Sequence, residues 1–189
     1  MNYYGAKDLA ASFRTVRKNT LTIAEEIPED KYSYRPAEGT RTVGELLTHI
    51  AFGGKFQEAV VLNEKRTSME GFDFMTFMGG IAAEAAKPRT KAQIIALLKE
   101  EGEKYASAVE SLSDDFIGVA VSMPPGGTPP SRTRFDMLAS VKEHEMHHRG
   151  QLMLIERMVG VVPHLTREMM ARIAAMQAGQ SQAQSQGRS

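Results

Sequence analysis

Residues 142–151 read Lys-Glu-His-Glu-Met-His-His-Arg-Gly-Gln, and they contain three of the five histidines of this 189-residue chain. They lie in a proline-free segment, residues 134–159, that we predict to be one long helix. Positions three and four apart share one face of a helix. One stripe, of the kind that faces a bundle core, therefore collects Val141, His144, His148, Leu152, Ile155 and Val159. His147 falls off the edge of this stripe.

Two histidines within an otherwise apolar stripe need a partner. Burying a polar group without one costs about 1–3 kcal/mol, and a metal ion shared by His144 and His148 removes this cost. The alternative is a pair of core histidines that bond to carboxylates or to the backbone. The spacing of four residues, with a third histidine nearby, favours the metal ion.

Composition narrows the classes of protein that are compatible with this chain. Cysteine is absent, so disulfides and cysteine metal ligands are excluded. The formal net charge is zero, without the basic surplus typical of nucleic-acid-binding proteins. No run approaches the ~18 apolar residues of a membrane span, and the N-terminus lacks the pattern of a signal peptide. We expect a cytoplasmic protein that binds neither nucleic acid nor membrane.

Four segments repeat apolar residues at steps of three and four, which is typical of helices with one buried face. They are residues 9–27, 42–63, 90–112 and 134–159. Pro28 ends the first, Thr42 and Glu45 form a capping box at the second, and Thr90 caps the third. With no convincing strand, the sequence predicts an all-α fold, a four-helix bundle.

The remaining segments are less regular. We expect a loop and a short helix in residues 64–88, whose phenylalanines and methionines either cap a pocket or fill core. Residues 116–123 are a candidate extended piece, and the proline- and glycine-rich residues 124–130 an exposed connection. A short extra helix is expected over residues 164–176 and a disordered C-terminal tail from Gln177. The predicted domain is residues 1–176, and the tail is residues 177–189.

A third histidine lies on a core-facing stripe of the second helix, which reads Leu46, His49, Gly53, Phe56 and Val60. Gly53 either leaves space beside His49 for a metal ion or substrate, or permits a close helix crossing. Metal sites in bundles are commonly built from facing helices. We therefore predict that His49 converges with His144 and His148.

Three imidazoles with an open position describe a catalytic metal site rather than a closed structural one. The open position holds water or a substrate atom such as a thiolate. Zinc suits three imidazoles, and nickel, iron or manganese could also occupy such a site.

Two other functions stay open. Residues 144–148 match His-Glu-x-x-His, the zinc metalloprotease motif, with Glu145 as the base. That hypothesis needs a further ligand, for which Glu168 is a candidate, and gives His49 no role. The other is a bundle that binds a partner without chemistry.

Two segments resemble the DinB/YfiT-like superfamily of metal-dependent enzymes. Residues 35–51 read Arg-Pro-Ala-Glu-Gly-Thr-Arg-Thr-Val-Gly-Glu-Leu-Leu-Thr-His-Ile-Ala, and residues 144–152 read His-Glu-Met-His-His-Arg-Gly-Gln-Leu, close to a His-x-x-x-His-Arg-Gly-Gln pattern. The resemblance covers residues 1 to about 176. It implies a four-helix bundle, a metal site at His49, His144 and His148, and a homodimer.

The same resemblance bears on activity. Relatives include thiol transferases that use low-molecular-weight thiols such as bacillithiol or mycothiol, and many relatives have no assigned reaction. We expect one divalent metal ion, zinc or nickel, that activates such a thiol or water to act on a small-molecule substrate, as a thiol transferase or hydrolase.

Three residues near the histidines have open roles. Glu145 is expected to orient a histidine, to lie at the surface or to accept a proton, in that order. Gln151 could form a hydrogen bond near the site. His147 could bond to the backbone or line a dimer interface.

Overall fold

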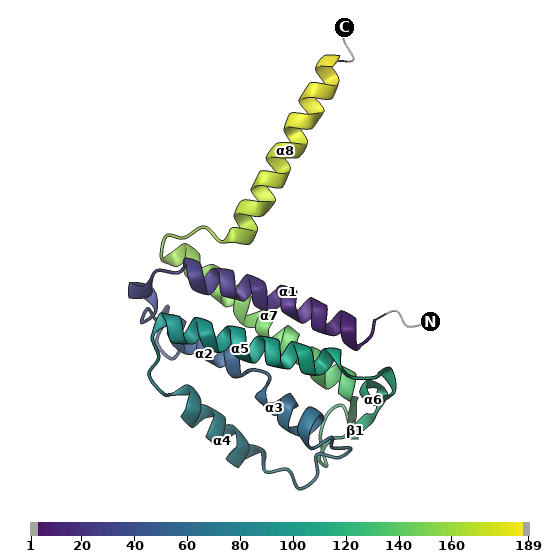
Figure 1. Ribbon diagram of the computed structural model, residues 1–189. Coiled ribbons are helices and arrows are strands. Elements are labelled where there is room, and N and C mark those ends of the chain that lie inside the picture. Colours follow the sequence, from purple (N-terminus) through teal and green to yellow (C-terminus); the bar gives the residue numbers. More distant parts are fainter. Residues whose placement is uncertain (1–3, 187–189) are drawn as a thin grey trace.

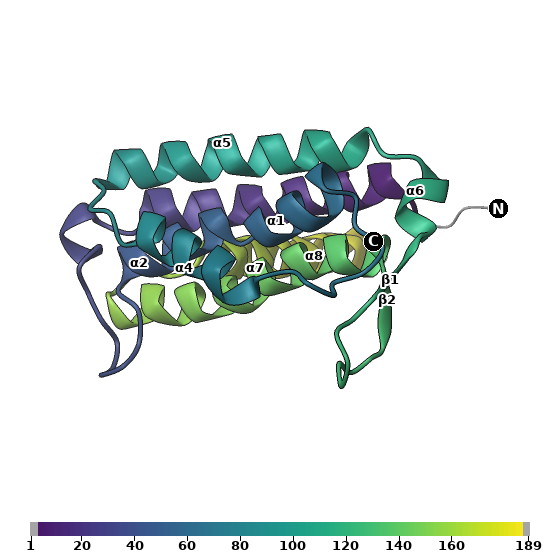
Figure 2. The ribbon, with the colours of Figure 1, turned by 90° about the horizontal axis from the view of Figure 1, so that it is seen from below.

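The computed structural model describes residues 4–186, with side chains described up to residue 180. The four helices that form its bundle are α1 (Ala6–Glu26), α2 (Val43–Phe52), α5 (Lys91–Glu110) and α7 (Arg134–Met158). Both α1 and α2 pack against α5 and α7, so α1 and α2 occupy opposite corners of a bundle (Figures 1 and 2). This confirms the all-α four-helix bundle.

The predicted caps start these helices. The Thr42 hydroxyl accepts a hydrogen bond from the Glu45 backbone N–H at 3.2 Å, and the Glu45 carboxylate accepts one from Thr42 N–H at 2.7 Å. Thr90 forms the same kind of box with Gln93, and Thr133 caps α7. Each cap satisfies backbone donors that the first turn of a helix leaves unpaired.

The stripe predicted one continuous helix over residues 42–63, and this prediction is wrong. The helix ends at Phe52, turns at Gly53 and Gly54, and resumes as α3 (Lys55–Gln57) and the π-helical η2 (Glu58–Asn63). A Cβ at Gly53 would lie 3.0 Å from His144 Nδ1. The glycines therefore serve the close approach of another helix, and their low helix propensity permits the break.

The core divides along the bundle into two buried clusters. One is formed by residues such as Leu9, Phe13, Val109 and Leu138. The other is formed by residues such as Ile23, Leu47, Leu98 and Leu152. Along α1 and α7, the level between the clusters carries Arg17 and Glu145, which are both buried.

Shorter elements surround the bundle. A 3-10 turn, η1 (Glu29–Lys31), follows α1, and α4 (Phe74–Ala85) lies outside the bundle beside α2 (Figure 1). The predicted extended piece is divided into α6 (Asp114–Gly118) and β1 (Ala120–Ser122). β1 pairs antiparallel with β2 (Ser131–Thr133). The described part of the chain therefore contains one small β-hairpin, where the sequence showed no convincing strand.

The C-terminal helix differs from the prediction. α8 (His164–Gln186) continues through residues 177–186, where a disordered tail was expected, and Figure 1 shows it projecting from the bundle. Alanine and glutamine favour helix, and this segment has no proline to stop it. The last predicted tail residues, 187–189, lie outside the described residues.

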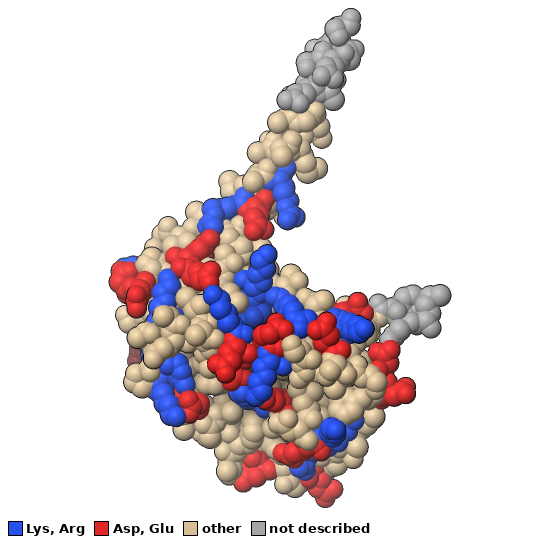
Figure 3. Space-filling view, viewed as in Figure 1, with Lys and Arg blue, Asp and Glu red and all other residues tan. Residues whose placement is uncertain are grey.

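The face formed by α1 and α5 carries interleaved acidic and basic side chains (Figure 3). Arg14 pairs with Glu103 and Glu110 at 2.8 Å, and Lys99 pairs with Glu25 at 3.1 Å. Within residues 4–186, none of the helices combines the length and apolar character needed to cross a bilayer.

Candidate metal centre

Three histidines from two helices meet at one point. His49 lies on α2, and His144 and His148 lie one turn apart on α7. The Nε2 atoms of His49 and His144 are 3.0 Å apart, those of His49 and His148 3.1 Å, and those of His144 and His148 3.0 Å. The structure thus brings together the three residues that sequence reasoning selected.

This donor set fits one metal ion. Two imidazole nitrogens that bind the same zinc ion at about 2.0–2.1 Å can be no more than about 4.2 Å apart. Without an ion, each Nε2 is either a protonated donor or a lone-pair acceptor. Of three mutually adjacent nitrogens, at least two must then be alike, so hydrogen bonds cannot satisfy every pair. A cation can accept all three lone pairs at once.

The histidines are electrically neutral at physiological pH. Burial, the largest cause, lowers the pKa of His49 to about 4, and the charge of Arg41 adds to this effect. Burial and the neighbouring His148 likewise lower the pKa of His144 to about 4. Burial also lowers the pKa of His148. Neutral imidazole is the form that binds metals, so little proton competition opposes an ion at neutral pH.

Gln151 fixes the orientation of His148. His148 Nδ1 lies 2.8 Å from Gln151 Oε1, and because an amide oxygen only accepts, Nδ1 carries the proton. The lone pair of His148 is thereby left on Nε2, which faces the other two histidines. The Gln151 amide nitrogen donates in turn to His147 Nε2 at 3.3 Å. His147 is exposed, and its Nε2 is bonded to this amide rather than joined to the cluster of three histidines.

Glu145 has a different role from the three that were expected. It is 1% exposed, and its carboxylate accepts hydrogen bonds from Arg17 Nε at 2.9 and 3.0 Å and from Arg17 Nη2 at 2.9 Å. Arg17 also donates to the carbonyls of Leu98 at 2.7 Å and Ile50 at 3.4 Å. This ion pair links all four bundle helices. It also argues against the protease hypothesis, because the carboxylate of the His-Glu-x-x-His match is bound to an arginine.

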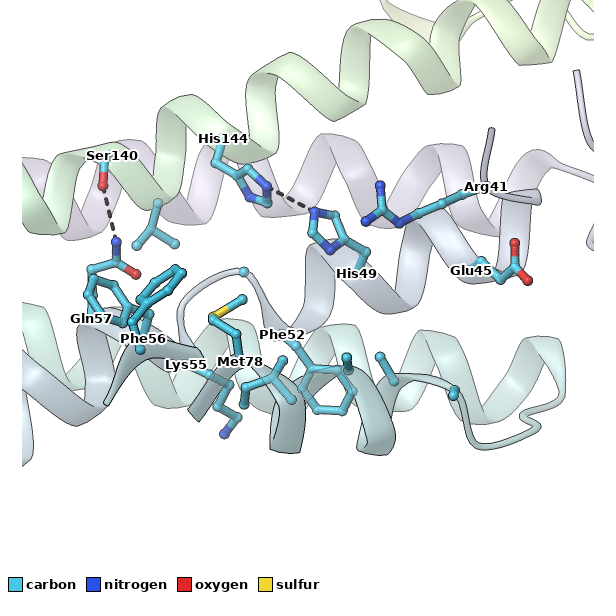
Figure 4. Close-up of a pocket in the computed structure, with 17 residues that line it drawn as sticks. Arg41, Glu45, His49, Phe52, Lys55, Phe56, Gln57, Met78, Ser140 and His144 are labelled. Carbon is cyan, nitrogen blue, oxygen red and sulfur yellow. Dashed lines mark hydrogen bonds between the residues drawn. The ribbon is translucent and has the colours of Figure 1, made fainter. Parts of the chain in front are cut away.

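A cavity of about 600 Å³ opens beside the histidines. His49 and His144 form part of its wall, as Figure 4 shows. The opposite wall comes largely from α4, whose contributions are Phe74, Met78, Ile81, Ala82 and Ala85. Of the phenylalanines and methionines of residues 64–88, Phe74 and Met78 line the cavity, whereas Met69 is buried in the core and Phe72 packs against it, so both expected roles occur.

Comparison with known proteins assigns the family. Residues 12–152 match the family model described as the DinB superfamily. The chain belongs to the DinB superfamily. It is 25% identical over 156 residues to the uncharacterised protein YjoA of Bacillus subtilis strain 168, and the match covers 82% of this chain and 91% of YjoA.

Solved structures agree with this membership. The crystal structure of YjoA has a TM-score of 0.59 at 26% identity, covering 80% of this chain and 91% of that one. YfiT from Bacillus subtilis, described as a probable metal-dependent hydrolase with an unusual four-helix bundle topology, has a TM-score of 0.62 at 16% identity, covering 82% and 88%. A DinB-like protein from Bacillus cereus ATCC 10987 has a TM-score of 0.63 at 15% identity, covering 86% and 97%.

The DinB-superfamily match contains the three histidines, Gln151 and the Arg17–Glu145 pair, and it ends before α8. Sequence reasoning missed two residues near this DinB centre. Arg17 stands four residues after Phe13 on the buried side of α1, which was the available signal. Arg41 precedes the cap of α2, where helical periodicity gives no information.

Proposed function

We propose that this chain is a metal-dependent enzyme in which His49, His144 and His148 hold one divalent ion, zinc or nickel. The observation that carries the proposal is the convergence of three imidazoles, two of which, those of His49 and His144, line a cavity large enough for a small molecule. When bound, the ion would lower the pKa of a water molecule or thiol at its open position, and would deprotonate a thiol outright.

The surrounding residues favour a thiol as the nucleophile. Glu145 is buried, is bound to Arg17 and does not line the cavity, so it does not offer a base there. Among the residues that line the cavity, the single carboxylate belongs to Glu45, whose Oε2 accepts from Thr42 N–H and Arg35. A site without a free side-chain base suits a nucleophile that needs none, so we propose transfer of a low-molecular-weight thiol to a small electrophile. Hydrolysis, suggested by the description of YfiT, is the second candidate.

Metal content is the first test. Untagged wild-type protein, purified without chelator, is expected to carry about one zinc or nickel ion per chain by elemental analysis. His49→Ala should lose that ion while keeping its helical circular dichroism, because two ligands on one helix bind far more weakly than three. His147→Ala is the matched control and should keep the ion. Retention by His49→Ala would contradict the three-histidine site, and no metal in the wild type, even after zinc or nickel is offered, would contradict both metal-dependent functions.

Activity of the loaded protein then separates the two reactions. Thiol transfer predicts metal-dependent consumption of a chromogenic aryl halide only when a low-molecular-weight thiol is present. Hydrolysis predicts release of nitrophenol from a nitrophenyl ester without any thiol. His49→Ala is the negative control for both assays.

We also propose that the functional unit is a homodimer. Large apolar side chains on α8 are 47–67% exposed, namely Met169, Met170, Ile173 and Met176. Leu154, Met158 and Val162, on α7 and just after it, are also exposed. Exposed apolar surface of this kind is typical of protein–protein contacts, and a second copy of the chain presents the same residues for burial.

A further inference from the structure

The cavity beside the histidines has an uneven charge balance. Lys55 reaches its wall but pairs with Glu58 at 3.1 Å and with Glu101 at 2.5 Å. Glu45 is engaged by Thr42 and Arg35. Arg41 also lines the cavity, and none of the described carboxylates lies within ion-pair distance of its guanidinium. Arg41 is thus an exposed cation with no ion-pair partner among the described residues.

Arg41 lies on the same side of the cavity as His49. Figure 4 shows its guanidinium directed from the start of α2 towards His49. The end of the cavity at the three histidines is therefore positive, and a divalent ion would make it more so, since like charges at close range repel.

The opposite side of the cavity is apolar. Its wall there includes Phe52, Phe56, Phe74, Met78 and Ile81. Phe56 packs edge-to-face on Phe74 with ring centroids 5.5 Å apart, which holds the start of α4 against α3. A molecule that fills this space meets a cation at one end and hydrocarbon at the other.

Building on the proposed function, we propose that Arg41 binds a carboxylate of the substrate, and that the substrate is an organic acid whose apolar portion lies against Phe56, Phe74 and Met78. The planar guanidinium matches a carboxylate through two parallel hydrogen bonds. The bound carboxylate supplies the counter-charge that the described residues do not. The reacting part of the substrate is then held between Arg41 and the apolar wall, beside the histidines.

The test uses two ligands of the same shape, phenylbutanoate and phenylbutanamide, which differ in charge. Isothermal titration of the zinc-loaded wild type is expected to show binding of the acid at least tenfold tighter than binding of the amide, because hydrogen bonds to charged groups are the strong ones. Arg41→Gln should abolish this preference while binding the amide as the wild type does. Arg149→Gln removes an equal charge from α7, at a residue that does not line the cavity, and should keep the preference.

Zinc content, measured on the same samples, separates this inference from the proposed function. Loss of the preference in Arg41→Gln with zinc retained supports the inference. An unchanged preference in Arg41→Gln, or binding of neither ligand to the wild type, overturns it. If the wild type holds no zinc yet prefers the acid through Arg41, the metal-dependent function fails and the carboxylate site stands.

Discussion

Gln151 orients one histidine of the candidate metal centre. Its amide oxygen accepts from His148 Nδ1 at 2.8 Å, which keeps the His148 lone pair on Nε2. Gln151→Ala should free the ring and weaken zinc binding about 10–100-fold, the usual effect of removing such a partner. Competition with a chromophoric chelator measures this affinity.

The control for Gln151 is His147→Ala. This change removes the partner of the Gln151 amide nitrogen but leaves the His148 contact in place. It should therefore change the zinc affinity little. Equal losses in both variants, or no loss in Gln151→Ala, would show that the orientation of His148 does not depend on Gln151.

For single residues, the helical phase predicted which side chains on the stripes face the core. It selected His49, His144 and His148 because each occupies a core-facing position. It could not assign Glu145, whose partner Arg17 is 128 residues away in the sequence. Periodicity gives the direction of a side chain within its own helix, whereas the identity of the group opposite depends on how the helices pack.

Between elements, the Arg17–Glu145 ion pair is the most buried of the described ion pairs. Arg17 is 5% exposed, and a Cβ at Gly102 would lie 2.8 Å from its side chain. The glycine on α5 therefore leaves the space that the Arg17 side chain occupies. Arg17→Met should destabilise the bundle by about 3–5 kcal/mol, because it leaves the Glu145 charge buried and unpaired. Urea unfolding followed by circular dichroism measures the change.

The double variant Arg17→Met, Glu145→Leu tests the reason for that loss. Apolar side chains of similar volume avoid the unpaired charge, and such replacements are often neutral or stabilising relative to the ion pair. We expect the double variant to recover most of the stability lost in Arg17→Met. A double variant as unstable as the single one would show that packing of the Arg17 stem, rather than the buried charge, dominates.

Element prediction succeeded where local chemistry decides and failed where tertiary contacts decide. The caps at Thr42 and Thr90 are local, and both are present. The break at Gly53 could not be read from a stripe that continues through it, since the stripe does not reveal that the His144 ring of another helix lies against this position. The hairpin at residues 120–133 depends on two strands of three residues each, which are too short for a pattern to indicate.

The whole molecule separates its charged surface from its apolar one. The α1 and α5 face carries interleaved acidic and basic side chains (Figure 3), which include the Arg14–Glu103 and Lys99–Glu25 ion pairs. Most of the large exposed apolar side chains of the described residues lie on α8 and at the end of α7, whereas Phe74 and Met75 lie on α4. Sequence periodicity missed this second surface because it treats an apolar residue as buried by its own chain, and a helix that projects from the bundle has no neighbour of its own.

The homodimer is the prediction that belongs to this scale. Replacing Met169, Met170, Ile173 and Met176 by serine removes most of the exposed apolar surface of α8 while leaving its Arg167–Glu26 contact with α1 intact. Sedimentation equilibrium is expected to show a dimer for the wild type and at least a tenfold higher dissociation constant for the variant, since each ~1.4 kcal/mol of lost binding is a factor of ten.

Glu168→Gln with Arg172→Gln, a polar change on the same helix, should leave the dimer unchanged. Zinc content should be equal in all three proteins, because the histidines lie on α2 and α7. A monomeric wild type, or an apolar-to-serine variant that still dimerises like the wild type, would mean that the apolar surface of α8 does not join two copies of this chain.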